Sequence, residues 1–137
     1  MFKKILVPVN GGNADAEAIR LACRLAKKDK GQVLVVSVVT IKRALPLDAE
    51  IDSEIKKAEV ILNNVENIAG EEDYEAETDV LQARDVGPAI VDEAVEWGAS
   101  LILMGVAYKQ RFGQFSLGSV IPYILKNSPC PVILYQQ

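Results

Sequence analysis

The sequence contains no histidine, and Cys23 and Cys130 are its only cysteines among 137 residues. The lack of histidine excludes Ser-His-Asp and Cys-His hydrolases and most zinc sites, because these depend on an imidazole. The two cysteines lie far apart and form no CxxC pair, so we expect reduced thiols rather than a disulfide scaffold. No pattern pairs a nucleophile with an activating base. We therefore expect a binding protein without catalytic residues, not an enzyme.

Long apolar runs are also missing. No segment approaches the ~20 apolar residues that span a bilayer. The apolar run after Lys3 and Lys4 ends at Pro8, which is too short for a secretory signal. These features predict a cytoplasmic protein with no membrane partner. Half of the residues are hydrophobic and a quarter are charged, which is typical of one globular domain spanning residues 1–137.

Positive charge is scarce in the middle of the chain. Residues 48–79 carry 12 acidic and 2 basic side chains, and the whole chain has a net charge of −4. An acidic chain without a dominant basic stripe is a poor candidate for nucleic-acid binding. We interpret the acidic segment as the solvated surface of a helix and an outer strand, and we expect no nucleic-acid partner.

Apolar patterning predicts an alternating β-α order along the whole chain. Short apolar runs predict buried strands, strict alternation predicts a half-buried edge strand at 74–80, and 3–4-residue spacing predicts helices. The expected strands are 5–9, 33–39, 74–80, 101–104 and 132–135, and the expected helices are 14–28, 48–69, 86–97 and 119–127. Asn13 is the expected N-cap of the first helix. The alternation predicts an α/β fold with a doubly wound parallel sheet and helices on both faces.

Two loops follow strands at the edge where such sheets bind ligands. One is Asn10-Gly11-Gly12, and the other runs from Gly105 to Ser119. A glycine at a strand end lets the backbone approach a ligand closely. Gly118-Ser119 at a helix start offers free N–H groups and a hydroxyl, which suit a phosphate. From spacing alone, the same pair is more often an ordinary helix start.

Three segments make the chain resemble the universal stress protein (UspA-like) family over its full length. KILVPVNG at 4–11 is similar to the family's opening ILVPVDGS. ASLILMG at 99–105 is similar to ADLIVMG, and LGSV followed by PCPVIL within 117–134 is similar to LGSV and APCPVLVV. The resemblance implies a Rossmann-like five-stranded parallel sheet of order 3-2-1-4-5, a dimer, and for some members a bound ATP.

The resemblance also assigns roles to individual positions. It places three residues on the adenosine side of a nucleotide site, namely Pro8, Asn10 and Val38. It places four on the phosphate side, namely Gly105, Gly118, Ser119 and Val120. Members that bind ATP show Gly-x2-Gly-x9-Gly-Ser/Thr after the fourth strand, and Gly105, Gly118 and Ser119 match that spacing.

This chain departs from the family pattern at three positions. Tyr108 replaces the second glycine, Asn10 replaces an aspartate, and Gly12 replaces a serine. Asparagine keeps an acceptor oxygen but loses the charge and adds a donor, so contacts to adenosine weaken rather than vanish. Two hypotheses stay open. One is a stress-response module that binds ATP or AMP weakly or in altered form, and the other is a nucleotide-free dimeric adaptor.

Two partner expectations accompany these hypotheses. No carboxylate lies between Gly105 and Ser119, so we expect magnesium only together with ATP and no metal site of the protein's own. Residues 132–135 form an apolar edge strand that carries no charge. Such an edge needs a cover, so we expect a homodimer through Val132 to Tyr135.

Tyr108 is the residue that we expect to limit nucleotide affinity. A tyrosine in a phosphate-binding loop strains the backbone by ~1 kcal/mol or fills the space for phosphates. Tyr108→Gly should therefore tighten the binding of ATP or AMP, measured by calorimetry. An unchanged or weaker affinity would show that Tyr108 stacks on the ligand or has no part in binding.

Overall fold

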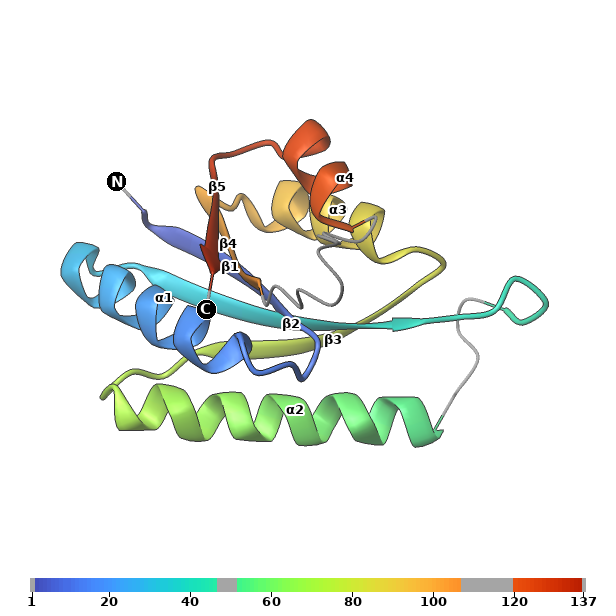
Figure 1. The fold of residues 1–137 in the computed structure, drawn as a ribbon, viewed down its shortest axis with the longest axis horizontal. Helices are drawn as coiled ribbons and strands as arrows, with labels where there is room; N and C mark the ends of the chain where they lie inside the picture. The colour runs from blue at the N-terminus through green and yellow to red at the C-terminus, as the bar shows by residue number, and fades with distance from the viewer. Residues whose placement is uncertain (1, 47–51, 107–119, 137) are drawn as a thin grey trace, which may run out of the picture.

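The computed structural model describes residues 2–46, 52–106 and 120–136. Within these ranges five strands alternate with four helices (Figure 1). The strands are β1 Lys4–Val9, β2 Gln32–Thr40, β3 Glu77–Ala83, β4 Leu101–Val106 and β5 Val132–Gln136. The helices are α1 Asp15–Asp29, α2 Asp52–Glu71, α3 Val86–Trp97 and α4 Val120–Asn127. The order of elements predicted from the sequence is confirmed.

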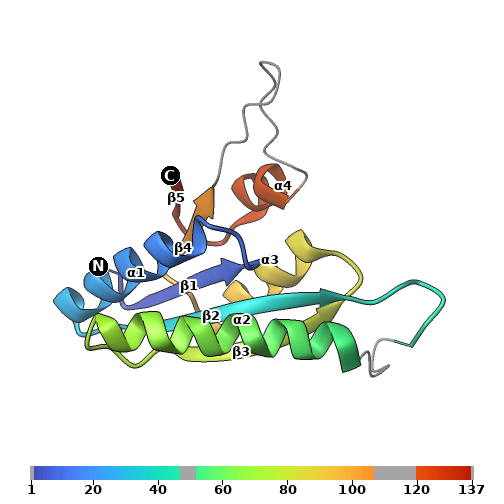
Figure 2. The ribbon, with the colours of Figure 1, turned by 60° about the horizontal axis from the view of Figure 1, so that its bottom comes forward.

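The strands form one parallel sheet of order β3-β2-β1-β4-β5, which also confirms the expected topology. Helices α1 and α2 cover one face, and α3 and α4 cover the other (Figures 1 and 2). The chain proceeds outward from β1 to β3, then returns to the other side of β1 for β4 and β5. The strand order therefore reverses between β1 and β4, where parallel sheets leave a crevice at their carboxyl ends.

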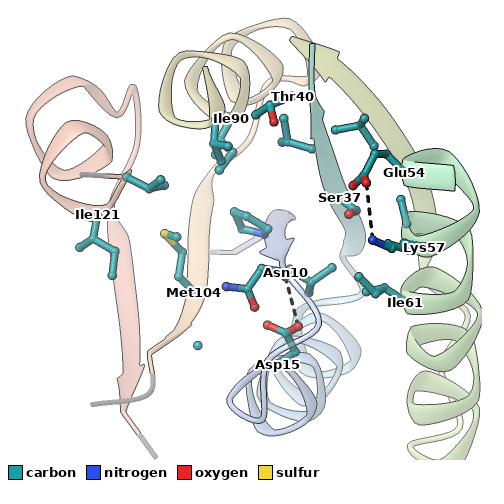
Figure 3. Close-up of a pocket in the computed structure, with 18 residues that line it drawn as sticks. Asn10, Asp15, Ser37, Thr40, Glu54, Lys57, Ile61, Ile90, Met104 and Ile121 are labelled. Carbon is teal, nitrogen blue, oxygen red and sulfur yellow. Dashed lines mark hydrogen bonds and ion pairs between the residues drawn. The ribbon is translucent and has the colours of Figure 1, made fainter. Parts of the chain in front are cut away.

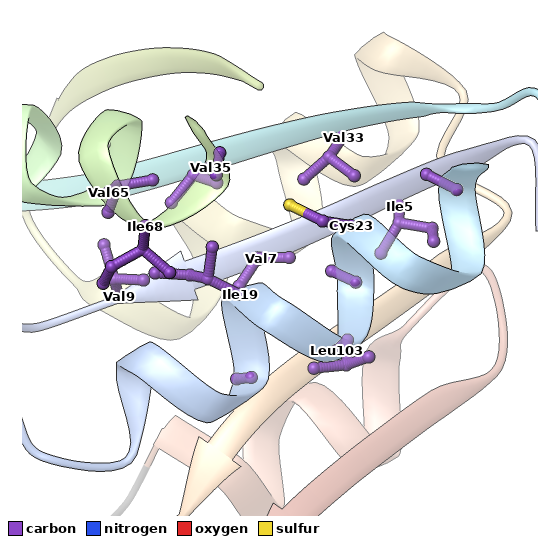
Figure 4. Close-up of a cluster of buried hydrophobic side chains, with 14 of the residues drawn as sticks. Ile5, Val7, Val9, Ile19, Cys23, Val33, Val35, Val65, Ile68 and Leu103 are labelled. Carbon is purple, nitrogen blue, oxygen red and sulfur yellow. The ribbon is translucent and has the colours of Figure 1, made fainter. Parts of the chain in front are cut away.

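Burial on both faces explains the unbroken apolar runs of the central strands. Ile5, Leu6 and Val7 are all completely buried, and consecutive residues face opposite helix layers. Figure 4 shows the layer between the sheet, α1 and α2. Cys23 lies in this layer, and burial raises the pKa of its thiol to about 11. The thiol therefore stays protonated near neutral pH and packs as a small apolar side chain.

Three local details differ from the expectations. The third strand begins at Glu77 rather than Tyr74, because the Tyr74 amide donates to the carbonyl of Ala69 and its hydroxyl donates to the carbonyl of Gly31. Helix α2 runs through Gly70, where the sequence suggested an end. Helix α1 starts at Asp15 with Ala14 as N-cap, so Asn13 does not cap it. The edge position of β3 is confirmed.

No helix in the described ranges has the length and apolarity needed to cross a bilayer.

Candidate functional site

A cavity of about 560 Å³ opens at the crevice between β1 and β4 (Figure 3). The carboxyl ends of β1, β2 and β4 form its floor, and residues of α2, α3 and α4 surround it. Pro8, Asn10, Val38, Gly105 and Val120 all line this cavity. The structure thus brings together five of the positions suggested by the resemblance. Tyr108, Gly118 and Ser119 lie outside the described residues.

One wall of the cavity is apolar. Five side chains from β2, α3, β4 and α4 form it, namely Val38, Val86, Ile90, Met104 and Ile121. They belong to the buried cluster on the α3 and α4 face, which holds them in place. A mostly apolar cavity with a few polar groups is typical of small-molecule sites. This wall suits the flat face of an aromatic ring.

Asn10 follows β1 and uses its side-chain oxygen within its own loop. The Gly12 amide donates to Asn10 Oδ1 at 2.8 Å, a local hydrogen bond that favours a turn. Gly11 takes a φ of +87°, which requires glycine, and the turn follows from this conformation. The oxygen keeps a second lone pair, and the Nδ2 group adds two N–H donors. Asn10 could therefore both donate to a ligand and accept from it, where an aspartate would only accept.

Asp15 supplies the carboxylate of this loop from the first turn of α1. Its Oδ2 accepts from the Gly11 amide at 2.7 Å and from the Asn10 amide at 3.2 Å. Partial burial raises the pKa of the carboxyl group, and the hydrogen bonds from backbone amides oppose that rise. Asp15 also lines the cavity. The side chain thus fixes the loop that presents Asn10, and it places a negative charge in the cavity beside Asn10.

Gly105 has a packing role that the sequence did not reveal. A Cβ at this position would overlap the carbonyl oxygen and carbon of Ala14, just before α1. The missing side chain lets β4 and the start of α1 approach closely. The sequence suggested a close approach to a ligand, which stays a prediction, and in the structure the close neighbour of Gly105 is the backbone of Ala14.

Besides Asp15, sequence reasoning missed four further polar residues of the cavity. Ser37 and Thr40 come from β2, and Glu54 and Lys57 come from α2, where Lys57 Nζ lies 3.5 Å from Glu54 Oε1 (Figure 3). Glu54 and Lys57 belong to the polar stripe of an amphipathic helix, which the sequence predicts to be solvated. Only the packing of α2 against the end of β2 brings that stripe to the cavity.

The described residues contain no group of three or more potential metal ligands among Cys, Asp and Glu. The expectation of magnesium together with ATP stays a prediction.

A family model described as the universal stress protein family matches residues 1–136. The chain belongs to this family. A universal stress protein of Methanocaldococcus jannaschii is 31% identical to it over 143 residues, which cover 100% of this chain and 84% of the relative. Family membership therefore agrees with the motifs, the topology and the location of the cavity.

Solved structures of universal stress proteins have the same fold. One from Archaeoglobus fulgidus matches with a TM-score of 0.82 and 25% identity, covering 98% of each chain. Another structure from that organism, in complex with dAMP, matches with a TM-score of 0.77 and 26% identity, covering 97% of each chain.

Substitution of Gly105 tests its packing role. Gly105→Ala should lower the free energy of unfolding by about 1–3 kcal/mol, the usual cost of inserting a carbon into a packed site. Gly70→Ala is the matched control, because a Cβ at Gly70 meets no atom within 4 Å. Because alanine favours a helix over glycine, Gly70→Ala should raise the free energy of unfolding by about 0.5–1 kcal/mol. Urea denaturation measures both, and equal stability of Gly105→Ala and the wild type would contradict the packing role.

Proposed function

We propose that this universal stress protein is a regulatory module that binds an adenine nucleotide, AMP or ATP, in the cavity between β1 and β4. The observation that carries the proposal is the convergence of Pro8, Asn10, Val38, Gly105 and Val120 on one cavity with an apolar wall. The dAMP complex of the Archaeoglobus fulgidus protein supports this choice of ligand class.

The cavity suggests how the nucleotide would lie. The base would pack on the apolar wall near Val38, and the sugar would meet the Asn10 side chain. The phosphates would lie toward Gly105 and the start of α4, because the N–H groups of a helix start and the helix dipole favour an anion. We infer that Asn10 alters the sugar contact, because it offers a neutral donor in place of a carboxylate.

We propose binding without turnover. The Asp15 carboxylate, which lines the cavity, accepts two backbone hydrogen bonds and serves to hold a loop. Magnesium would enter only with ATP, held by its phosphates and by water. A stress-response role in the cytoplasm follows from the family and from the expectations of the sequence.

The second candidate is a nucleotide-free dimeric adaptor of the same family. The observation that favours it is the hydrogen bond from the Gly12 amide to Asn10 Oδ1, which uses one of the two lone pairs that this oxygen could offer a sugar hydroxyl. Tyr108 at a glycine position favours it too.

Calorimetry separates the two candidates. Adenosine, AMP and ATP, the last with and without magnesium, are titrated into protein stripped of any co-purified nucleotide. One-to-one binding of AMP is expected, with no binding of magnesium alone. Mass spectrometry of the unheated protein before stripping checks for a natural adenine nucleotide. Absence of both binding and co-purified nucleotide would overturn the first candidate and leave the adaptor.

A homodimer through β5 is the proposal common to both candidates. β5 is an edge strand, and Val132, Ile133, Leu134 and Tyr135 each remain partly exposed. An apolar edge of this kind is covered most simply by the same strand of a second copy across a two-fold axis.

Light scattering at micromolar concentration tests the dimer. The wild type should be a dimer, and Ile133→Lys should shift it to a monomer that stays folded by circular dichroism. Glu77→Lys on the opposite edge strand, β3, is the control and should remain dimeric. A monomeric wild type, or a dimer that tolerates Ile133→Lys, would contradict the proposal.

A further inference from the structure

Ser37 is the one buried polar side chain in the described part of the chain, with 5% of its surface exposed. It lies in β2, beside Val9 of β1 and Val80 of β3 in the sheet register. The surrounding β2 residues, from Val33 to Val39, are otherwise leucine and valine. A buried hydroxyl is costly unless it forms a hydrogen bond. Its presence in this strand therefore calls for a partner.

The part of the chain that the structure describes does not supply that partner. Hydrogen bonds are recorded for many side chains in the described ranges, and the Ser37 hydroxyl takes part in none of them. No fully enclosed side-chain polar atom of the described residues lacks a partner. The Ser37 hydroxyl must therefore reach the open space that Ser37 lines, which is the cavity (Figure 3).

Strand alternation places this hydroxyl on the α2 side of the cavity. Val35 and Val39, two residues away in each direction, pack in clusters with α2 residues. Lys57 and Glu54 of α2 line the same cavity. Around Ser37 the cavity thus offers a hydroxyl, an ammonium and a carboxylate, opposite the apolar wall.

We propose that Ser37 is a ligand-contacting residue whose hydroxyl hydrogen-bonds the nucleoside end of the bound nucleotide. This inference rests on the proposed function. In the sheet, β2 lies on the far side of β1 from β4, whereas the phosphate side lies at β4 and α4. Ser37 therefore meets the part of the ligand most distant from the phosphates. A hydroxyl both donates and accepts, so it matches a base edge that carries adjacent donors and acceptors.

Ser37→Ala tests this contact by comparison with Ser53→Ala. Ser53 is an exposed serine of α2 outside the cavity, which makes it a matched control. Ser37→Ala should weaken the binding of adenosine and of AMP by the same factor, about threefold to tenfold, the range expected for one neutral hydrogen bond. Its melting temperature should equal or exceed that of the wild type, because the hydroxyl has no partner in the free protein. Ser53→Ala should change neither affinity.

The outcomes separate the inference from the proposed function. A wild type that binds neither adenosine nor AMP overturns the proposed function, and the inference with it. A wild type that binds both, with unchanged affinities in Ser37→Ala, overturns the inference alone. A loss seen for AMP but not for adenosine would place the hydroxyl at the phosphates and overturn it too. A lowered melting temperature in Ser37→Ala would show that the hydroxyl has a structural role, and would likewise count against the inference.

Discussion

The site depends on the reversal of strand order at β1. This strand pairs with β2 on one side and with β4 on the other. The sheet continues outward from β2 to β3 on the first side and from β4 to β5 on the second. The helix that follows β1 therefore covers one face of the sheet, and the helices that follow β3 and β4 cover the other. Between them the carboxyl ends of β1, β2 and β4 stay open, and the cavity lies there. The apolar core holds the strands in position, and the reversal of strand order at β1 determines where the cavity lies.

The loop after β1 shows how the chain builds a polar site on this frame. Asp15 holds the Asn10 and Gly11 amides, Gly11 takes a left-handed conformation, and Gly12 bonds back to Asn10. These contacts lie within six residues, so the loop is organised before any ligand arrives. Preorganisation lowers the entropy lost on binding. The same contacts fix the Asn10 side chain at the cavity, where Asp15 supplies the negative charge of the loop.

Most of the fold could be predicted from the sequence because the signals were local and repeated. Unbroken apolar runs predicted the buried strands, and spacing along α2 predicted a long amphipathic helix. The misplaced start of β3 reflects Tyr74, whose alternation fitted a strand but whose hydrogen bonds tie it to the end of α2 and to Gly31. The wrong cap of α1 reflects Asp15, whose side chain turns back to the loop.

The site was predicted only in part, for a physical reason. Pro8, Val38 and Gly105 lie near the carboxyl ends of strands, Asn10 follows β1, and Val120 begins α4. The resemblance identified all five. Ser37 carries no local signal, because one serine in an apolar strand has no periodicity, and its unpaired hydroxyl is evident only after the neighbouring elements have packed. Lys57 has the spacing of a solvated charge on the polar side of α2, and only the packing of α2 brings it to the cavity.

A structure of the protein with AMP tests the central claim most directly. The account predicts density for the nucleotide in the cavity between β1 and β4, with the base against Val38 and Ile90 and the phosphate toward the start of α4. The Asn10 side chain should donate to the sugar. A nucleotide bound elsewhere on the surface, or one whose phosphate lies at the β2 end of the cavity beside Ser37, would contradict the account.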